Sequence, residues 1–504
     1  MVKPVETTFL NMQKIFDNPA ELEKLAKEKY AVPQFLMMEN AAKAMAAFIE
    51  NHLPADKKTP PTLTIVCGKG NNGGDGYAVA RLLQDKCKVT IFSIEPAASE
   101  EAKVQYEMCR RLDLTFSENI GKPDFLLDCI YGTGFRGELS PQVKAIIDEM
   151  NKSPALKIAC DIPSGLYFNA DYTITMGCQK LTLYSDKAKA VCGKIIVADL
   201  GISREKFEQA AVESAENSSA SSIYLVEPSD MLLPYRKNRA AHKGCYGHTA
   251  VFSGDKGGAC ILAASAAMKF GSGLTTIINH TGSELSQFKI PPSLMISDKL
   301  PKKTSCILLG PGIIDHNLSD DQMIGDYFRN GNKTHAAVFD AGVFDMKGYI
   351  EEIKTYSQEA SNQIVLTPHL SELQRFLKRV REFYPEVSYT EEEISIESLA
   401  NSPETKIKIG REINRLFPNA ALIMKSANTF IAYQGNTYII TDGCQNLAKG
   451  GSGDILAGMI AALLSQGYTA LDAAITACEH HALTARKLGA EAYNLTPEEI
   501  ISNI

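Results

Sequence analysis

Short apolar runs alternate with amphipathic helical stretches along most of this chain, and the alternation limits the possible fold more than any other feature. The run TLTIVC (62–67), for example, is followed by a helical stretch at 74–86 and by a second run, VTIFSI (89–94). Buried strands that alternate with helices are typical of a parallel sheet covered by helices on both faces. The sequence therefore predicts an α/β fold.

The alternation occurs twice, once in each half of the chain. The first half has predicted helices at 35–52, 100–112 and 141–150, and predicted strands at 124–129, 156–160, 172–176, 180–184 and 194–198. The second half has predicted helices at 257–270, 370–381, 452–466 and 470–488, and predicted strands at 248–254, 306–310, 335–340, 363–367, 421–425, 429–433 and 436–440, the last three close enough for a hairpin.

A chain of 504 residues is too long for one hydrophobic core. The alternation weakens around AENSSASS (215–222), whose small polar residues are typical of a connector. We therefore expect two domains, 1–225 and 226–504.

Composition excludes several classes of function. The net charge of −7 argues against nucleic acid as a partner. No apolar run approaches the roughly 18 residues of a membrane helix, and the N-terminal segment lacks the pattern of a secretory signal. The 12 cysteines form no C-x-x-C pair, and most lie in apolar runs, as buried reduced thiols do. We expect a cytoplasmic protein with no membrane or nucleic-acid partner.

The segment GNNGGDG (70–76) lies between a predicted strand and a predicted helix. A helix N-terminus at the carboxyl edge of a parallel sheet offers free N–H groups to a phosphate. Glycines at 73, 74 and 76 would let the backbone approach a ligand and take positive φ angles. The segment predicts an anion-binding loop; the alternative is a tight turn in which Asp75 caps the helix.

Two further polar segments follow predicted strands of the first half, DCIYGTGFRGELS (128–140) and ACDIPSGL (159–166). Arg136 in the first could neutralise a phosphate. Asp128, Asp161 and Ser164 should reach the same edge of the sheet as the glycine segment. Polar strand ends that converge on one crevice are typical of a ligand site.

Together, GKGNNGGDGYAVARLL, DCIYGTGFRGELS and CDIPSGL resemble the epimerase domain of the NAD(P)H-hydrate repair enzymes, over roughly residues 10–215. The resemblance implies a Rossmann-like α/β/α domain that interconverts the R and S forms of NADH or NADPH hydrated at C6 of the nicotinamide ring. It implies that Asp161 is the acid or base. It implies a potassium ion held by Asn72, Asp128 and Ser164, a set of oxygen ligands that suits a hard cation.

The same resemblance implies which residues contact the hydrated dinucleotide: Asn71, Asn72, Gly73, Gly74, Asp75, Gly132, Thr133, Gly134, Phe135, Arg136, Gly137, Glu138 and Asp161. One departure concerns the segment LTLYSDKAK (181–189). Asp186 stands before Lys187 where the family usually has proline, which puts the contribution of this loop to the site in question.

In the second half, NLAKGGSGDILAGMIAALLSQG (446–467) places three glycines before a strongly apolar helix and Asp454 in the first turn of that helix. Backbone N–H groups at such a helix start can bind a phosphoryl group, and a neighbouring carboxylate can deprotonate the attacking hydroxyl. The alternative is that Asp454 caps the helix.

This glycine–aspartate turn resembles the ribokinase-like α/β/α fold. HKGCYGHTAVFSGDKGGACILAASAAMKFGSGLTTI (242–277), LGPGI (309–313), LTPHLSELQRF (366–376) and IMKSANTFIA (423–432) narrow the resemblance to the ADP/ATP-dependent hydrate dehydratases, over roughly 230–490. The resemblance implies that ADP or ATP, with Mg²⁺, phosphorylates the 6-hydroxyl of the S-hydrate and that phosphate elimination restores the reduced dinucleotide. Relatives of this kind often form tetramers, so we expect a homo-oligomer.

In that reaction Asp454 would be the base, and the N–H groups of Gly451 and Gly453 would stabilise the transferring phosphoryl group. The residues implied in the hydrate pocket are Ala259, Gly312, His369 and Asp454, and those implied at the nucleotide are Lys425, Ser426, Ala427, Asn428, Thr429 and Gly453. His369 could instead cap the next helix, with Glu372 as an acid of its first turn.

Two residues of the second half depart from the family pattern. Ser426 replaces a glycine that commonly follows Lys425, at a cost if the backbone there needs positive φ. Lys449 replaces a smaller polar residue, and could reach a phosphate or lie in solvent.

Two other functions are compatible with these motifs. The chain could be a small-molecule kinase fused to a regulatory domain, because the same fold and the same Asp454 would serve it. It could also be a scaffold with eroded sites, although the retained Asp161 and Asp454 argue against that. The fusion itself favours repair, because an epimerase would make the substrate of the dehydratase.

Overall fold

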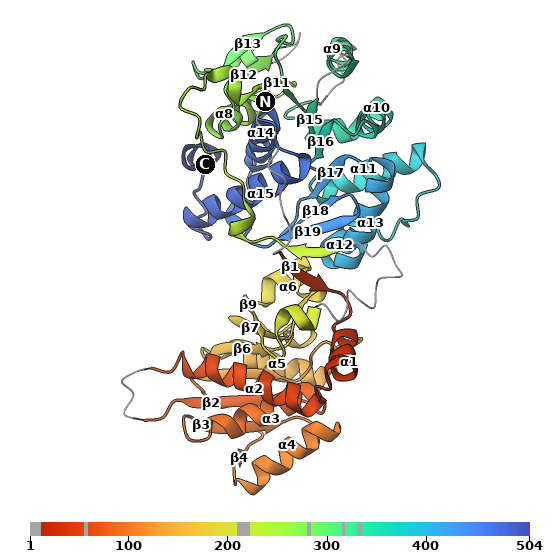
Figure 1. The fold of residues 1–504 in the computed structure, drawn as a ribbon. Helices are drawn as coiled ribbons and strands as arrows, with labels where there is room; N and C mark the ends of the chain where they lie inside the picture. Colours follow the sequence, from red (N-terminus) through yellow and green to blue (C-terminus); the bar gives the residue numbers. More distant parts are fainter. Residues whose placement is uncertain (1–11, 55–58, 209–221, 280–283, 315–317, 330–334) are drawn as a thin grey trace. The chain divides into compact units, whose positions relative to one another are not determined.

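The computed structural model describes residues 12–54, 59–208, 222–279, 284–314, 318–329 and 335–504 (Figure 1). The chain divides into two compact units, an N-terminal one of Lys14–Ala220 and a C-terminal one of Ser221–Ile504, to which Met12 and Gln13 also belong. Except for Ser222, the predicted connector AENSSASS lies outside the described residues. The domain limits 1–225 and 226–504 stay a prediction, but the short strand just before the predicted boundary pairs within the C-terminal unit.

The N-terminal unit contains a parallel sheet in the strand order β4-β3-β2-β5-β6-β7-β9. Its strands are β2 (Thr62–Cys67), β3 (Lys88–Ser93), β4 (Thr115–Phe116), β5 (Phe125–Cys129), β6 (Leu156–Cys160), β7 (Tyr172–Met176) and β9 (Lys194–Ala198). Its helices are α1 (Pro19–Tyr30), α2 (Gln34–Glu50), α3 (Asn71–Leu83), α4 (Glu100–Arg111), α5 (Pro141–Lys152) and α6 (Asp186–Val191). A short parallel pair, β1 (Gln13–Phe16) and β8 (Gln179–Lys180), lies outside this sheet order.

The strand order reverses between β2 and β5: the chain runs outward through β3 and β4, and then returns to continue on the other side of β2. Ligands of open α/β sheets bind at such a switch point, outside the carboxyl ends of the strands. The segments that follow β2, β5 and β6 therefore meet at the place where a ligand is expected.

The C-terminal unit contains a larger sheet in the order β13-β12-β11-β14-β15-β16-β17-β18-β19-β10. Its strands are β10 (Ile223–Leu225), β11 (His248–Phe252), β12 (Leu274–Ile278), β13 (Met295–Ser297), β14 (Cys306–Leu309), β15 (Ala336–Phe339), β16 (Gln363–Leu366), β17 (Ala420–Met424), β18 (Thr429–Tyr433) and β19 (Asn436–Ile440). Its helices are α8 (Gly257–Lys269), α9 (Leu318–Arg329), α10 (Lys347–Gln358), α11 (Leu370–Phe383), α12 (Ile396–Asn401), α13 (Pro403–Leu416), α14 (Ser452–Ser465), α15 (Ala470–Lys487) and α16 (Pro497–Asn503).

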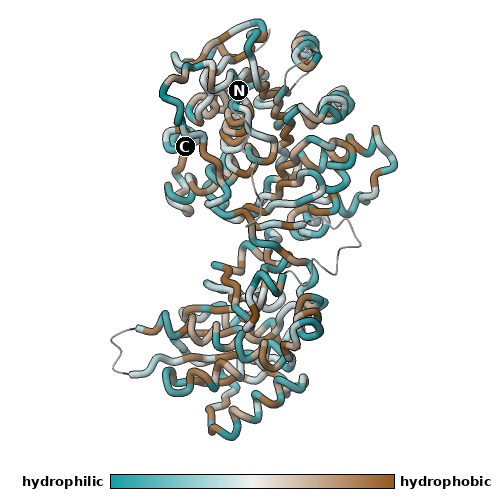
Figure 2. The backbone as a smooth tube through the Cα atoms, viewed as in Figure 1, coloured by the Kyte–Doolittle hydropathy of each residue, from teal (hydrophilic) through white to brown (hydrophobic). Residues whose placement is uncertain are grey.

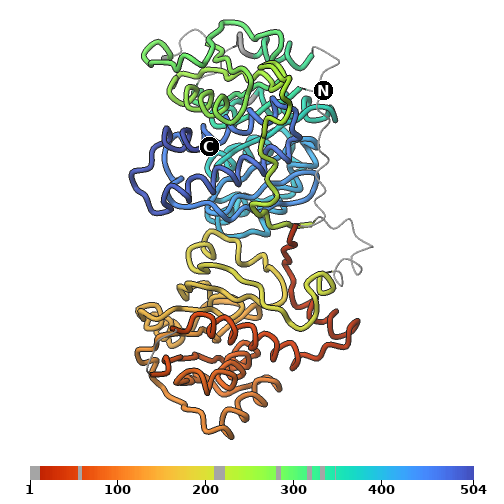
Figure 3. The backbone as a smooth tube through the Cα atoms, turned by 60° about the vertical axis from the view of Figure 1, so that its left-hand side comes forward, coloured from red at the N-terminus to blue at the C-terminus, as the bar shows by residue number. Residues whose placement is uncertain are grey.

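The strands from β13 to β17 are parallel, and β17, β18 and β19 are antiparallel neighbours, which confirms the predicted hairpin region. A second switch point lies between β11 and β14. Helix α8 follows β11 and helix α14 follows β19, so the two helices are far apart in the chain, but they pack against each other. In Figure 3 the blue C-terminal helices accordingly lie beside the green segment.

Apolar side chains fill both units, in two clusters in the N-terminal unit and one in the C-terminal unit. Apolar residues follow the strands of both units (Figure 2), and α14 is buried on nearly every side. The cysteines in the apolar runs, Cys67, Cys129, Cys160 and Cys306, are buried and unbridged, as predicted. In the described part of the chain, no helix has the length and apolar character needed to cross a membrane.

Two predicted elements differ in the structure. The stretch 180–184 is not a strand: β8 ends at Lys180, and Leu181–Tyr184 form a turn of 3-10 helix that leads into α6. Leu181, Leu183 and Tyr184 are all buried, so apolarity alone did not distinguish a strand from this turn. Helix α3 begins at Asn71 instead of 74, so residues 71–76 of GNNGGDG are helical, and Gly70 is the N-cap.

Candidate active sites

A cavity of about 760 Å³ opens in the N-terminal unit at the switch point of its sheet. Asn71, Asn72 and Asp75 line it from the start of α3, Gly132 from the segment after β5, and Asp161 from the end of β6. The structure thus brings together the three segments that the sequence predicted to converge.

The glycines at the start of α3 serve close packing and not positive φ. None of Gly73, Gly74 and Gly76 has positive φ, which corrects that part of the prediction. A Cβ at Gly73 would lie 1.9 Å from the carbonyl oxygen of Gly68, and one at Gly76 would lie 2.8 Å from the Cys67 sulfur. These glycines let α3 start directly against the sheet, and Gly73 and Gly74 do not themselves line the cavity.

Asp75 does not cap α3. The N-cap residue is Gly70, and no side chain caps the helix, so the alternative of an aspartate cap is wrong. Asp75 instead points into the protein and contributes to the cavity wall, and burial raises its pKa well above the ordinary value.

We predict that Gly73→Ala destabilises the protein, because the added methyl group meets backbone that cannot move without shifting the start of α3. The expected loss is about 1–3 kcal/mol of unfolding free energy, measured by denaturant titration. Gly70→Ala is the matched control, since a Cβ at Gly70 meets nothing within 4 Å and its φ of −91° suits alanine. Equal stability of the two variants would contradict the proposed packing role.

The segment after β5 supplies much of one wall. Of the residues predicted to contact the dinucleotide, Gly132, Thr133, Gly134, Phe135 and Arg136 line the cavity, and Gly137 and Glu138 do not. The Arg136 guanidinium donates hydrogen bonds to two carbonyls of its own loop, Thr133 O at 2.6 Å and Phe135 O at 2.9 Å. Arg136 therefore shapes the loop as well as bringing positive charge to the cavity.

Asp161 has a backbone conformation that few residues adopt, with φ of 69°. Aspartate and asparagine tolerate this region better than other residues with side chains, and strained residues of this kind gather at functional sites. One carboxylate oxygen, Oδ2, accepts a hydrogen bond from the Thr133 N–H at 3.0 Å. The other, Oδ1, forms an ion pair with Lys180.

Lys180 is only 1% exposed, and its ammonium group faces Asp161 from the end of β8. Burial acts to raise the pKa of Asp161, but the charge of Lys180 outweighs it, with help from the Thr133 and Met176 N–H groups, and holds that pKa below the ordinary value. Asp161 is therefore an ionised carboxylate at neutral pH, as a proton acceptor must be.

The three predicted potassium ligands have different surroundings. Ser164 Oγ donates to Asp128 Oδ1 at 2.7 Å, and the Ser164 N–H donates to Asp128 Oδ2 at 2.8 Å. Burial raises the pKa of Asp128 to about 6, although these hydrogen bonds favour the ionised form and oppose the shift.

Asn72 lies nearer Asp161: a Cβ at Gly132 would be 2.8 Å from Asp161 Oδ2 and 3.2 Å from Asn72 Oδ1. The side-chain nitrogen of Asn72 is buried and has no hydrogen-bond partner among the described residues.

In the C-terminal unit, Asp454 is the third residue of α14, directly after the glycines. The N-cap is Gly451, in the left-handed region at φ of 93°, and no side chain caps the helix, so the capping alternative for Asp454 is wrong. Burial raises the pKa of Asp454 to about 7; the Asp340 and Glu372 carboxylates add to the shift, and Lys425 opposes it.

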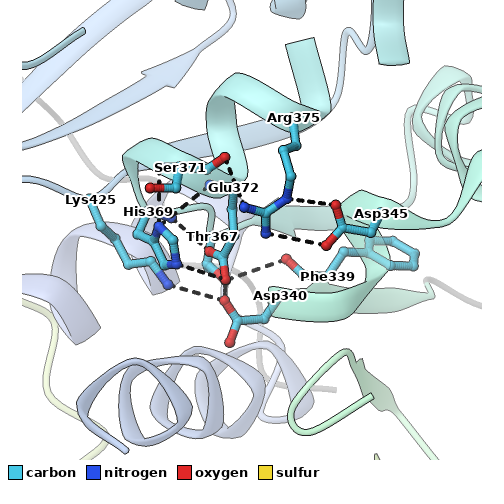
Figure 4. A network of polar contacts seen from close by, with 9 residues as sticks. All are labelled: Phe339, Asp340, Asp345, Thr367, His369, Ser371, Glu372, Arg375 and Lys425. Atoms are coloured by element: carbon cyan, nitrogen blue, oxygen red, sulfur yellow. Dashed lines mark hydrogen bonds and ion pairs between the residues drawn. The ribbon is translucent and has the colours of Figure 1, made fainter. Parts of the chain in front are cut away.

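A polar network lies at the carboxyl ends of β15, β16 and β17 (Figure 4), and the charges of its Asp340, Glu372 and Lys425 act on Asp454. Lys425 Nζ donates to Asp340 Oδ1 at 3.1 Å, and the Thr367 hydroxyl donates to the same oxygen at 2.6 Å. Lys425 also donates its backbone N–H to Pro368 O at 3.0 Å. These contacts join the segment predicted to bind nucleotide to the segment predicted to bind hydrate.

His369 is the N-cap of α11, and its Nδ1 accepts hydrogen bonds from the Ser371 and Glu372 N–H groups. The Glu372 carboxylate returns to the His369 N–H at 2.9 Å and lies 3.1 Å from His369 Nε2. The capping role, kept as an alternative, is thus confirmed. The half-exposed ring of His369 stands beside Glu372 in Figure 4, so capping and ligand contact are compatible.

The remaining predicted residues lie on two neighbouring stretches. Gly312, at φ of 73°, accepts a hydrogen bond from the Lys256 N–H at 3.0 Å, which holds it beside the start of α8, where Ala259 lies. Ala427, Asn428 and Thr429 lead from Lys425 into β18. A Cβ at Gly453 would be 3.4 Å from the Lys425 ammonium, so the glycine turn and the nucleotide segment meet.

The structure accounts for the departures from the family pattern. Ser426 does not have positive φ, so its side chain carries no backbone penalty, and its hydroxyl bridges Lys406 Nζ and Asn428 O at 2.7 Å each. Lys449 is an exposed residue, and its ammonium donates to Tyr493 O and Leu495 O, at 3.0 and 2.5 Å. Asp186 opens α6 and does not line the cavity.

Comparisons with known proteins match both halves of the chain. Residues 250–504 match the family model described as NAD(P)H-hydrate dehydratase, and residues 35–182 match the YjeF-related protein N-terminus. The bifunctional NAD(P)H-hydrate repair enzyme Nnr of Helicobacter pylori is 34% identical over 98% of this chain and 99% of its own length.

The chain belongs to the family of bifunctional NAD(P)H-hydrate repair enzymes.

The family extends to distant organisms. The enzyme of the same name from Moorella thermoacetica is 29% identical, over 89% of this chain and 87% of its own length. A solved structure of the ADP/ATP-dependent NAD(P)H-hydrate dehydratase from Bacillus subtilis, co-crystallised with ATP/Mg²⁺, is 22% identical, with a TM-score of 0.42, and covers 53% of this chain and 90% of that one. Family membership confirms the predicted fold class, a Rossmann-like α/β/α domain followed by a ribokinase-like one.

Several polar residues of the two sites were not found from the sequence. Lys180 lay inside a predicted strand, and Glu23 lies on α1, far from any glycine segment, although it lines the cavity. Asp340 could have been found, because it directly follows the apolar strand β15, as Asp161 follows β6.

Proposed function

We propose that this chain restores damaged reduced dinucleotides with two active sites, as the repair enzymes of its family do. The N-terminal unit interconverts the R and S hydrates of NADH and NADPH. The C-terminal unit converts the S form to the intact dinucleotide with ADP or ATP as phosphate donor. The observation that carries the proposal is that each unit has an aspartate, the buried Asp161 or the half-buried Asp454, at the carboxyl edge of its sheet beside a glycine-rich helix start.

In the epimerase site, the start of α3 and the Gly132–Arg136 segment would hold the dinucleotide, and the ionised Asp161 would face the altered ring. Asn72, Asp128 and Ser164 offer amide, carboxylate and hydroxyl oxygens, which suit potassium. The unpartnered side-chain nitrogen of Asn72 is a hydrogen-bond donor, so it supports a ligand with acceptor atoms here, as the dinucleotide has, and not the cation itself. When bound, the cation would add positive charge beside the dinucleotide.

In the dehydratase site, the hydroxyl at C6 is a poor leaving group, and phosphorylation makes it a good one. Asp454 would accept the hydroxyl proton as that oxygen attacks the terminal phosphoryl group of the nucleotide. The N–H groups of Gly451 and Gly453 and the Lys425 ammonium would stabilise the charge of the phosphoryl group. The carboxylates of Asp340 and Glu372 suit Mg²⁺, which takes one or two protein carboxylates together with phosphates.

We predict that the rate of dehydration rises with pH through about 7, because the pKa of Asp454 is raised to about 7 and only the ionised form accepts a proton. The measurement is kcat for the S-hydrate at saturating nucleotide between pH 5.5 and 8.5, with about a tenfold rise per pH unit on the acid side. A flat profile would show that Asp454 is not the titrating base.

The alternative, a small-molecule kinase fused to a regulatory domain, uses the same Asp454. The test is to incubate the full chain with pure S-hydrate and either ADP or ATP, and to follow the return of the absorbance band of the reduced nicotinamide. Recovery with at least one nucleotide supports repair and also identifies the donor. No recovery with either nucleotide would favour the kinase. A homo-oligomer in the cytoplasm remains our expectation.

A further inference from the structure

The epimerase cavity contains an acidic side chain that no sequence motif of the site includes. Glu23 lies on α1, the red helix of Figure 1, and lines the cavity together with Asp161. Helix α1 ends before residue 35, where the match to the YjeF-related domain begins. Gln34, at the start of α2, lines the same wall and hydrogen-bonds Glu23.

We propose that Glu23 is a second catalytic residue of the epimerase, which exchanges a proton with the substrate while Asp161 exchanges one at another point of the same cavity. The proposal rests on the epimerase activity proposed above. In one direction of the epimerisation, Glu23 is the proton donor and Asp161 is the proton acceptor. In the opposite direction of the reaction, the two residues exchange these roles.

The reaction needs two such groups. C6 carries a hydroxyl and is bonded to the ring nitrogen N1, so its configuration can invert when the C6–O bond breaks and re-forms on the other face. Glu23 donates a proton to the departing hydroxyl, which leaves as water, while the N1 lone pair forms the C6=N1 bond. A water molecule then adds to C6, the electron pair returns to N1, and Asp161 accepts the proton. One water leaves and one water adds, and one proton passes from Glu23 to Asp161.

The surroundings of the two carboxyl groups suit opposite roles. Lys180 forms a direct ion pair with Asp161 and keeps its pKa low. Glu23 forms no such ion pair with any residue that the structure describes. Burial raises its pKa and the charge of Asp161 adds to that shift, while the charge of Lys180 and the Gln34 hydrogen bond oppose it. Two carboxyl groups whose surroundings move their pKa values apart are the pattern of an acid–base pair.

Asp75 is the third carboxyl group that faces this cluster. It is 8% exposed and accepts a long contact from the Cys160 thiol at 3.8 Å, so it lies deeper than the half-buried Glu23. Asp75 shares the raised pKa and the place in the cavity wall, but Glu23 is the more exposed of the two and so is the more accessible to a substrate in the cavity.

The test uses the full chain with the R-hydrate of NADH, and separates the R and S epimers by chromatography. Glu23→Gln is expected to lower kcat of epimerisation by about 10²- to 10³-fold, with a much smaller change in KM. The wild-type rate should fall at high pH as Glu23 loses its proton, and this fall should be absent from the residual rate of Glu23→Gln. Glu23→Asp should recover part of the rate.

Glu21→Gln is the matched control, because Glu21 lies on the same helix and is exposed. A rate for Glu23→Gln within twofold of that control, or an unchanged fall at high pH, would overturn the proposal. If Glu23→Gln does not fold, the test uses the pH profile of Glu23→Asp instead. A catalytic Glu23 predicts that the pH at which the epimerisation rate falls differs between Glu23→Asp and the wild type. A purely structural role predicts the same pH for both, and would overturn the proposal. An inactive wild type would instead refute the epimerase activity itself.

Discussion

Asp454→Asn should abolish conversion of the S-hydrate, with kcat lowered by about 10³- to 10⁴-fold. Asparagine keeps the shape of the side chain but cannot accept the proton of the attacking hydroxyl. The measurement is the return of reduced-nicotinamide absorbance with saturating S-hydrate and nucleotide.

The fold of this variant should be intact, since Asp454 does not cap α14 and its charge opposes those of Asp340 and Glu372. Its unfolding free energy is therefore expected to equal or exceed that of the wild type. Epimerisation of the R-hydrate by the same sample is the internal control for the rest of the chain. Dehydration at a rate within tenfold of the wild type would show that another group is the base.

Lys180→Met should inactivate the epimerase and also destabilise its domain. Lys180 is buried beside Asp161, and its removal leaves a carboxylate that is 6% exposed without a counter-ion. Loss of one partner of a buried ion pair typically costs about 3–5 kcal/mol. Without the ammonium group, burial raises the pKa of Asp161, so the residual epimerase rate should increase with pH as the carboxyl group ionises.

A double-mutant cycle separates the two effects of Lys180→Met. The double variant Lys180→Met/Asp161→Asn removes both charges, so it should recover most of the lost unfolding free energy but none of the epimerase activity. Asparagine tolerates the left-handed backbone of position 161, where φ is 69°. If Lys180→Met is as stable and as active as the wild type, the ion pair has no part in holding Asp161 ionised.

The sequence was sufficient to predict the layers of both units and the segments that meet at each switch point. Strand–helix alternation and polar residues at the ends of apolar runs are local signals, and they located Asp128 and Asp161, while the glycine–aspartate turn before an apolar helix located Asp454. The start of α3 was predicted three residues late, because a glycine-rich stretch normally indicates a loop, and here the glycines allow a helix to begin against the sheet.

The partners of these aspartates could not be predicted in the same way. Lys180, the last residue of β8, meets Asp161 from a distant part of the chain, and the buried 3-10 turn after it has the same apolar composition as a strand. Glu23 reaches the cavity through the packing of α1, and nothing in the local sequence of an amphipathic helix separates it from an exposed glutamate such as Glu21. Such contacts depend on tertiary packing between distant segments.

The most direct test of the account is a single time course with the wild-type chain. A mixture of R and S hydrates of NADH is incubated with the chain and the nucleotide found to be active, and the recovery of NADH is followed beside a reaction that contains no protein. The account predicts complete recovery, with the R fraction restored faster than it converts spontaneously to S. Recovery that stops at the S fraction, or no recovery at all, would contradict the presence of two cooperating active sites on this chain.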